Sequence, residues 1–164
     1  MYQNTEKIMS LLSDTYKSAI LRIKRGHNNG VVSNAKPVLI LAIIEAIDEG
    51  ILLGNRISFP HDNLKELYTT IYSRNCLSDG IYRANVKVTP FNLPYFHLNA
   101  EEFYHIKWNA GVVSPSQAHS PSRKFLTENV DYAYLDDTLW ELFQDKDIRE
   151  EYKEAIITHY LKAE

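Results

Sequence analysis

The chain has 164 residues, 45% of them hydrophobic, with 18 Lys and Arg, 21 Asp and Glu and a net charge of −3. This length fits one domain with a packed core and argues against intrinsic disorder. A single cysteine, Cys76, excludes an internal disulfide and a cysteine-based zinc cluster. No apolar run reaches the roughly 20 residues that span a membrane, and no segment resembles a signal peptide, so we expect a cytoplasmic protein without membrane attachment.

The charges are unevenly distributed along the chain. Residues 1–126 contain 14 Lys and Arg against 10 Asp and Glu, whereas residues 127–164 contain 4 against 11. A net negative charge is unusual for a nonspecific nucleic-acid binder, but a binding face in the first part of the chain would be positive. We expect the acidic last part to be a solvated helical surface.

Apolar spacing predicts an amphipathic helix over residues 6–25, ended by Gly26. Its apolar positions are Ile8, Leu11 or Leu12, Tyr16, Ala19 and Ile23. The segment closes with three basic residues, Arg22, Lys24 and Arg25. They fit either a charged last turn, which complements the helix dipole, or a contact with phosphate.

A second helix is predicted around the almost continuous apolar run at residues 38–47, with Ser33 or Asn34 as its cap and Glu49-Gly50 as its end. Pro37 lies in its first turn, where a missing amide is harmless. Lys36 therefore stands at a helix start. The backbone amides and helix dipole there favour an anion, although an ordinary helix N-terminus explains the same residues.

Residues 51–59 predict a strand pair, or a strand and a turn, and Pro60 with Asp62 opens a helix over residues 64–72. This order of elements resembles the beginning of a winged-helix domain. A polar connection at residues 75–87 follows.

The segment from Thr89 to Trp108 alternates between apolar and polar or aromatic residues and predicts a hairpin that turns at residues 99–102. Its core face would hold Phe96, Leu98, Tyr104, Ile106 and Trp108. Its outer face would hold Tyr95, His97, Phe103, His105 and Lys107. Rings, imidazoles and an ammonium on one surface favour an anionic ligand with an apolar edge.

The last third of the chain predicts a loop at residues 109–122, a short helix beginning at Arg123 and Lys124, and two further helices capped by Asp136 and Asp147. The fold class expected for the whole chain is therefore α+β. We expect a helix-rich single domain with a small antiparallel sheet and a first half that resembles a winged helix.

The titratable residues do not form a recognisable catalytic or metal-binding pattern. His97 and His105 could face each other across the predicted hairpin, but no carboxylate or third imidazole follows at ligand spacing. His27-Asn28-Asn29 has letters of an HNH nuclease without its metal-holding elements, and no phosphate loop or serine elbow is present. We expect no enzymatic activity, no metal and no cofactor.

A set of short motifs, in order and at matching spacing, resembles the DNA sulfur-binding domain of phosphorothioate-dependent HNH restriction endonucleases. The motifs are Asn34–Ala42, Glu49–Ile51, Asn55–Ile57, Leu93–Leu98 and Ala133–Asp136. The resemblance covers residues 33–161 and leaves residues 1–32 as an N-terminal amphipathic helix and loop.

The resemblance implies binding of double-stranded DNA that carries a phosphorothioate in its backbone. By position it assigns the sulfur site to Lys36, Leu93, Pro94 and His97. Surrounding DNA contacts would come from Tyr95, His105, Lys107, Arg123 and Lys124. The family often has Arg at the position of Lys36 and an aromatic ring at that of Leu93. No HNH domain accompanies the motifs, so cleavage would need a separate nuclease or regulator.

Two other functions fit the same residues. The chain could be a protein-interaction or regulatory module that uses the aromatic outer face and recruits a basic partner through its acidic last helix. It could also be a winged-helix DNA binder that is indifferent to sulfur. A hydrolase is the least favoured interpretation.

Overall fold

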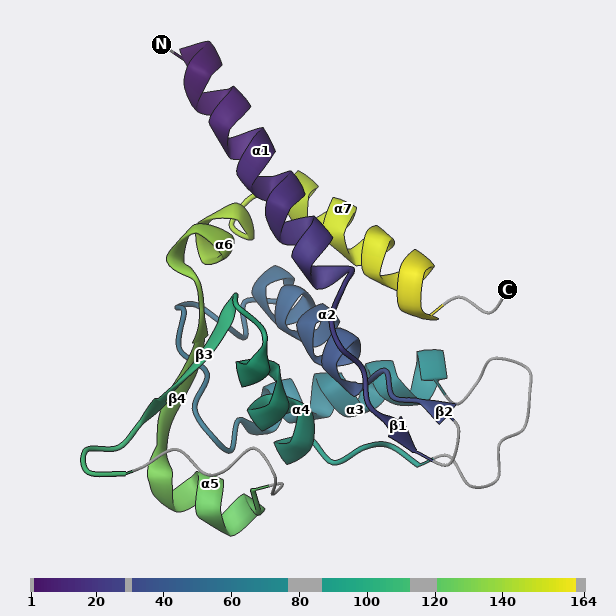
Figure 1. The fold of residues 1–164 in the computed structure, drawn as a ribbon, viewed down its shortest axis with the longest axis vertical. Coiled ribbons are helices and arrows are strands. Elements are labelled where there is room, and N and C mark those ends of the chain that lie inside the picture. Colours follow the sequence, from purple (N-terminus) through teal and green to yellow (C-terminus); the bar gives the residue numbers. More distant parts are fainter. Residues whose placement is uncertain (1, 29–30, 77–86, 113–120, 162–164) are drawn as a thin grey trace.

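The protein is described here by a computed structural model that covers residues 2–28, 31–76, 87–112 and 121–161. It is 62% helical with small antiparallel sheets, which confirms the α+β class (Figure 1). The helices are α1 (Tyr2–Ile20), α2 (Ala35–Asp48), α3 (Asp62–Cys76), α4 (Asn92–His97), α5 (Arg123–Asn129), α6 (Asp137–Leu142) and α7 (Lys146–Ile156). A 3-10 turn, η1 (Leu98–Ala100), follows α4, and a π-helical turn, η2 (Ile157–Leu161), follows α7. The strands are β1 (His27–Asn28), β2 (Val31–Val32), β3 (Tyr104–Trp108) and β4 (Val130–Leu135).

Helix α2 is the centre of the core. Residues 37–44 are buried without interruption, so the helix has no solvated face over these turns. It contacts α3, α4 and α7, which lie around it (Figure 1). The helix ends as expected, with Glu49 as C-cap and Gly50 at a φ of 73°, a left-handed conformation that glycine adopts without steric cost.

The hairpin expected over residues 89–108 is wrong in its first arm. Residues 92–97 form α4, in which Pro94 occupies the first turns, where its missing amide removes no helical hydrogen bond. The second arm is a strand, β3, but its antiparallel partner is β4, with His105 opposite Tyr134 and Ile106 opposite Ala133. Within this segment, the alternation of residue types therefore marks a strand only in β3.

The chain between α2 and α3 contains no strand pair. Ile57 makes an isolated antiparallel bridge to Ala133, in which each residue donates its amide to the other's carbonyl at 2.8 Å. This bridge attaches residues 51–59 to the edge of β4. The segment resembles a third, single-residue strand of that sheet rather than a hairpin of its own.

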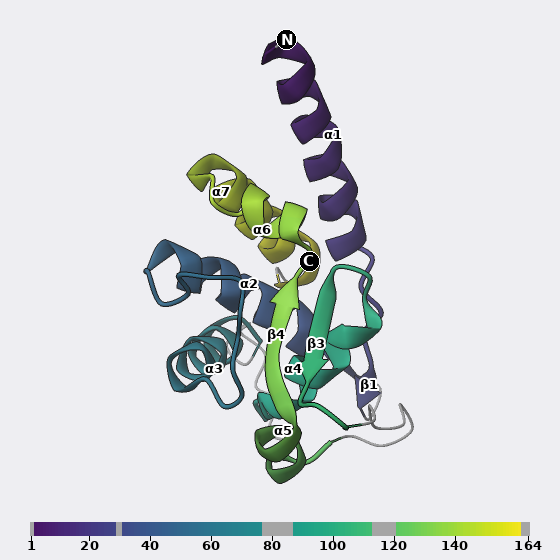
Figure 2. The same ribbon diagram turned by 90° about the vertical axis from the view of Figure 1, so that its left-hand side faces the viewer.

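Helix α1 ends at Ile20, five residues before the predicted Arg25, and its first turns extend beyond the body of the protein (Figure 2). Its second half packs on α6 and α7. Tyr152 of α7 donates its hydroxyl hydrogen to the carbonyl of Ser13 at 2.6 Å, which fixes α7 against α1.

Helix starts near the C-terminus agree with the sequence to within two residues. Ser122 caps α5, because its hydroxyl oxygen accepts from the amide of Phe125, and Asp136 precedes α6 as expected. The last helix is capped by Asp145 instead of Asp147, since the Asp145 carboxylate accepts from two amides of the first turn.

Most of the polar connection at residues 75–87 and of the loop at residues 109–122 lies outside the described residues. Over the part of the chain that is described, no helix combines the length and the apolarity that crossing a membrane requires.

Candidate nucleic-acid interface

Lys36 occupies the first turn of α2, where the free amides of the helix create a partial positive charge. Only 16% of its side chain is exposed. Its ammonium lies 3.5 Å from Oε1 of Glu101, whose side chain is 17% exposed. The start of α2 is therefore a partly buried cationic site whose present partner is a carboxylate from the turn after η1.

The packing of α4 against α2 brings His97 into the electrostatic field of Lys36. Burial lowers the pKa of the His97 imidazole, and the positive charge of Lys36 lowers it further. His97 is consequently neutral over a wider pH range than an exposed histidine. Two of the four residues expected at the sulfur site, from segments about 60 positions apart, thus lie close together.

The other two expected residues, Leu93 and Pro94, precede His97 on α4. Pro94 is buried and Leu93 is partly buried. Leu93 lies four residues before His97, so the two side chains share one side of α4, and Leu93 makes that side partly apolar.

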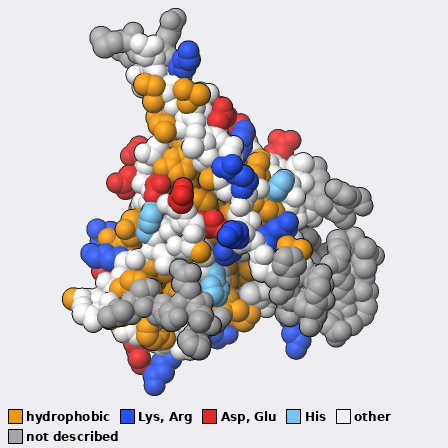
Figure 3. All heavy atoms as spheres, viewed as in Figure 1, with side chains coloured by type: hydrophobic (Ala, Val, Ile, Leu, Met, Phe, Trp, Pro, Cys, Tyr) orange, Lys and Arg blue, Asp and Glu red, His pale blue; other side chains and the backbone are white. Residues whose placement is uncertain are grey.

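Two basic residues that the site assignment left out are linked to the start of α2, Lys24 through its backbone amide and Arg25 through its side chain. Oε1 of Glu101 also accepts from the amide of Lys24 at 3.2 Å. Arg25 donates to Oδ1 of Asn34, the N-cap of α2, at 2.8 Å, and its guanidinium stacks over the ring of Tyr160 at 4.8 Å. Figure 3, viewed from the same side as Figure 1, shows Lys and Arg side chains near the middle of the molecule, below α1. The sequence did contain the signal, since the basic group at residues 22–25 fitted a phosphate contact.

His105 and Lys107 lie on the outer face of the β3–β4 sheet, as the alternation predicted. The His105 ring is 5.1 Å from that of Tyr134, and the Lys107 ammonium is 5.3 Å from the ring centroid of Tyr132. Both also contact carboxylates, because His105 Nε2 lies 2.5 Å from Asp136 and Lys107 lies 3.7 Å from Asp131. This outer face is aromatic, and each of its two basic side chains has a carboxylate as a partner.

Tyr95 does not lie on the outer face, so its assignment as a surface contact is wrong. Its side chain is 0% exposed, and its hydroxyl donates to the carbonyl of Ile57 at 2.6 Å. Burial raises the pKa of this phenol. Phe103 is buried as well. Tyr95 departs from the expectation because α4 is a helix, whose side chains do not follow the two-sided alternation of a strand, whereas Phe103 lies in the turn that precedes β3.

Arg123 and Lys124 are exposed at the start of α5, as predicted. Arg123 lines a cavity of about 220 Å³ together with Lys65 of α3 and Asn92, the first residue of α4. Asn92 also donates to the carbonyl of Pro121 at 3.2 Å. Cations therefore lie near both ends of α4, with Lys36 beside His97 and Arg123 beside Asn92.

Across the residues that the structure describes, no group of three or more His, Cys, Asp or Glu side chains is placed to hold a metal ion. The absence of a metal from the working protein stays a prediction, as does the boundary expected between residues 32 and 33.

No protein-family model matches the chain, and no curated protein matches it in sequence. Solved structures with a similar fold include the following two. One holds the sulfur-binding and SRA domains of ScoMcrA complexed with phosphorothioated DNA, with a TM-score of 0.66 and 12% identity over 89% of this chain. The other holds the sulfur-binding domain of ScoMcrA with the same kind of DNA, with a TM-score of 0.64 and 12% identity over 88%. The chain spans 42% of the first structure and 86% of the second. The resemblance seen in the motifs is thereby confirmed at the level of fold.

Proposed function

We propose that this protein is a DNA-binding module that recognises a phosphorothioate in the backbone of duplex DNA and does not cleave it. The observation that carries the proposal is the position of Lys36, at the N-terminus of a buried helix and beside His97, in a chain with the fold of a sulfur-binding domain. The similar structures contain phosphorothioated DNA, which names the ligand class to test.

The chemistry of the ligand fits this arrangement. A phosphorothioate keeps the negative charge of a phosphate but replaces one nonbridging oxygen with sulfur, which is larger, more polarizable and less strongly hydrated. Lys36 and the free amides of α2 would neutralise the charge. Leu93 and Pro94 would contact the sulfur, which loses less hydration than oxygen when it meets an apolar surface. His97, neutral near physiological pH, would complete the site without repelling Lys36.

Contacts to ordinary phosphates would position the duplex on this site. Exposed cations that could make them include Lys24, Lys107, Arg123 and Lys124, and the half-buried His105 and Arg25 could add to these. Each phosphate neutralised releases counterions, so affinity should fall steeply as salt rises.

This chain would recognise the modified DNA, and another protein would cut it. A module of this kind would act in the cytoplasm, in restriction or defence that depends on DNA sulfur modification, by delivering a separate nuclease or regulator to modified sites. The described residues offer no metal-holding cluster that would make the chain itself a nuclease.

The test is an anisotropy titration with duplexes of one sequence that differ only in a single linkage. One duplex is unmodified, and the other two carry one phosphorothioate as either stereoisomer, each measured at two salt concentrations. Tighter binding of one stereoisomer, weakened by salt, is the expected result. Equal affinity for all three would instead indicate a sulfur-indifferent DNA binder. An absence of binding to any duplex would leave the protein-interaction alternative.

A further inference from the structure

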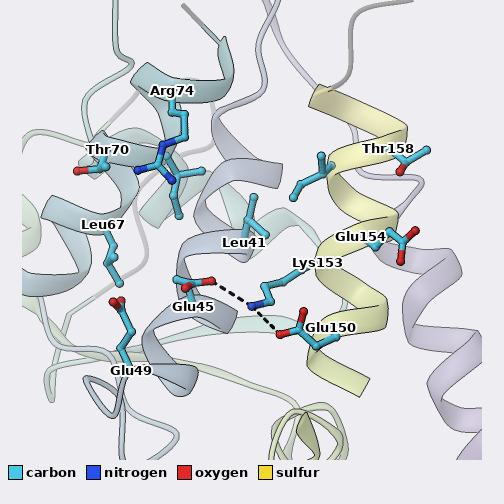
Figure 4. Close-up of a pocket in the computed structure, with 12 residues that line it drawn as sticks. Leu41, Glu45, Glu49, Leu67, Thr70, Arg74, Glu150, Lys153, Glu154 and Thr158 are labelled. Atoms are coloured by element: carbon cyan, nitrogen blue, oxygen red, sulfur yellow. Dashed lines mark hydrogen bonds and ion pairs between the residues drawn. The ribbon is translucent and has the colours of Figure 1, made fainter. Parts of the chain in front are cut away.

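A groove runs between α3 and α7, with α2 as its floor, and has a volume of about 690 Å³ (Figure 4). The residues from α3 are Leu67, Thr70, Ile71 and Arg74, and those from α7 and η2 are Glu150, Lys153, Glu154, Ile157 and Thr158. Both sets recur at intervals of three and four, so one face of each helix is turned toward the groove. The groove is bounded by two helical faces about two turns long, which is the shape that accepts a third helix.

The floor of the groove is apolar and its margin is acidic. Leu41 and Ile71 are buried at the bottom, with Leu67 and Ile157 partly buried beside them. Four carboxylates line it, Glu45, Glu49, Glu150 and Glu154, against two cations, Arg74 and Lys153.

Lys153 is not available to an incoming anion. Its ammonium contacts Glu45 at 3.2 Å and Glu150 at 3.0 Å (Figure 4), and it also contacts Asp48 at 2.6 Å. Burial by itself would lower the pKa of Lys153, but the hydrogen bonds to these carboxylates hold the pKa above its ordinary value. Arg149 also pairs with Asp48, so two cations face three carboxylates and the cluster keeps a net negative charge.

Glu49 and Glu154 are exposed on the two sides of the groove. Among the described residues, neither of these two carboxylates forms an ion pair or a side-chain hydrogen bond. They are the acidic groups that remain for a partner.

The groove lies on the opposite side of α2 from the proposed DNA site. Glu45 follows Lys36 by nine residues, which is about two and a half turns at about 3.6 residues per turn, so the two side chains leave the helix in opposite directions. DNA held at Lys36 would not cover the groove, and the acidic margin would repel DNA from it.

We propose that this groove is the docking site for a basic amphipathic helix of a partner protein. Apolar side chains of that helix would fill the floor over Leu41 and Ile71, and its Lys or Arg side chains would pair with Glu49 and Glu154. The inference goes beyond DNA recognition and does not depend on it, although a partner held here would be carried to any site that the opposite face binds.

The experiment uses a synthetic helical peptide of about 18 residues with leucine at the intervals of one helix face and lysine elsewhere. A second peptide replaces every lysine with glutamate and keeps the leucines. Binding to the full chain is measured by fluorescence anisotropy and mapped by amide chemical shifts, without DNA. We expect the lysine peptide alone to bind, with shifts concentrated at Leu67, Ile71 and Ile157.

The double variant Glu49→Lys and Glu154→Lys should lower affinity for the lysine peptide by at least about tenfold. Both changes place a cation near the C-terminal end of a helix, where it is stabilising, so folding should be kept. The matched control is Glu66→Lys with Glu141→Lys, which makes the same charge change at exposed positions of α3 and α6 outside the groove.

Three results would overturn the proposal. An equal loss in both double variants would mean attraction to net charge alone. If the glutamate peptide bound as tightly as the lysine peptide, the groove would not select a basic partner. Failure of the lysine peptide to bind, or shifts spread over surfaces away from the groove, would remove the docking site. Because no DNA is present, none of these outcomes bears on phosphorothioate recognition.

Discussion

Lys36 and Glu101, 65 positions apart in the chain, form an ion pair with Nζ 3.5 Å from Oε1 and with both side chains mostly buried. Glu101 therefore occupies the position beside the Lys36 ammonium that an anionic ligand would need. A backbone phosphorothioate would have to displace this carboxylate or share Lys36 with it. Glu101 is thus expected to weaken DNA binding while it satisfies Lys36 in the free protein.

Removing the charge of Glu101 should strengthen binding. We expect Glu101→Gln to raise affinity for phosphorothioated duplex about three- to tenfold, because roughly 1 kcal/mol is typical of competition from one partly screened ion pair. Gln keeps an oxygen that can accept from the Lys24 amide. Anisotropy at low salt measures the change, with Glu102→Gln as a control at an exposed neighbour. A similar gain in the control would assign the effect to net charge, and a weaker Glu101→Gln complex would show that Glu101 positions Lys36.

Removing the cation should have the opposite effect. Lys36→Ala is expected to abolish the preference for phosphorothioate over phosphate and to lower overall affinity at least about tenfold, since it leaves the ligand charge to the helix amides alone. Competition between modified and unmodified duplexes measures the preference. Lys146→Ala, at an exposed position at the start of α7, is the matched control.

If Lys36→Ala still preferred phosphorothioate over phosphate, the proposed sulfur site would be wrong. Pro94→Glu should also block sulfur recognition by placing a carboxylate beside the ligand, but Pro94 is buried, so this variant should lose stability too. The Lys36 variant therefore decides the question, and the Pro94 variant is informative only where a melting curve shows that it is folded.

Tyr95→Phe should change stability and leave binding alone. The variant removes the 2.6 Å hydrogen bond to Ile57, whose carbonyl is buried in the same core, and we expect a cost of about 1 to 2 kcal/mol in the free energy of unfolding. Urea titration measures the cost. DNA affinity should stay within about twofold, and a larger loss in a folded variant would return Tyr95 to the interface.

Asp48 should make stability depend on pH in the acid range. Burial alone would raise the pKa of this carboxyl, but hydrogen bonds from Lys153 and Arg149, and their charges, hold the pKa below its ordinary range. The unfolded chain then binds the proton more readily, so the stabilisation is complete above the unfolded pKa and is lost as pH falls through the folded value.

Asp48→Asn tests this directly. At neutral pH we expect a loss of about 2 to 4 kcal/mol, because the substitution leaves two partly buried cations with fewer partners. The difference from the parent should shrink when urea titrations are repeated near pH 3. A difference that is constant with pH would assign the loss to packing. Asp147→Asn, exposed in the first turn of α7, is the control.

Local sequence patterns determined the elements whose stability is local. The apolar run at residues 38–47 predicted a helix buried on most sides, and the start of α5 was predicted at Arg123, because a continuous apolar surface and a helix start depend on neighbouring residues. The order of short motifs also identified the fold, which the two similar structures confirm. Lys36, Leu93, Pro94 and His97 were named as the sulfur site from that order, and this role stays a prediction.

Tertiary packing alone decided which side chains meet. Residues 92–97 fit a strand by alternation, yet they fold as a helix because α4 packs on α2, while β3 takes its partner from β4 about 25 residues later. That change moved Tyr95 from an expected surface into the core. Lys36 with Glu101, and the helical faces of α3 and α7 across the groove, are likewise pairs from distant segments. Periodicity reports only a residue's own element, and the energy that selects such pairs comes from burial between elements.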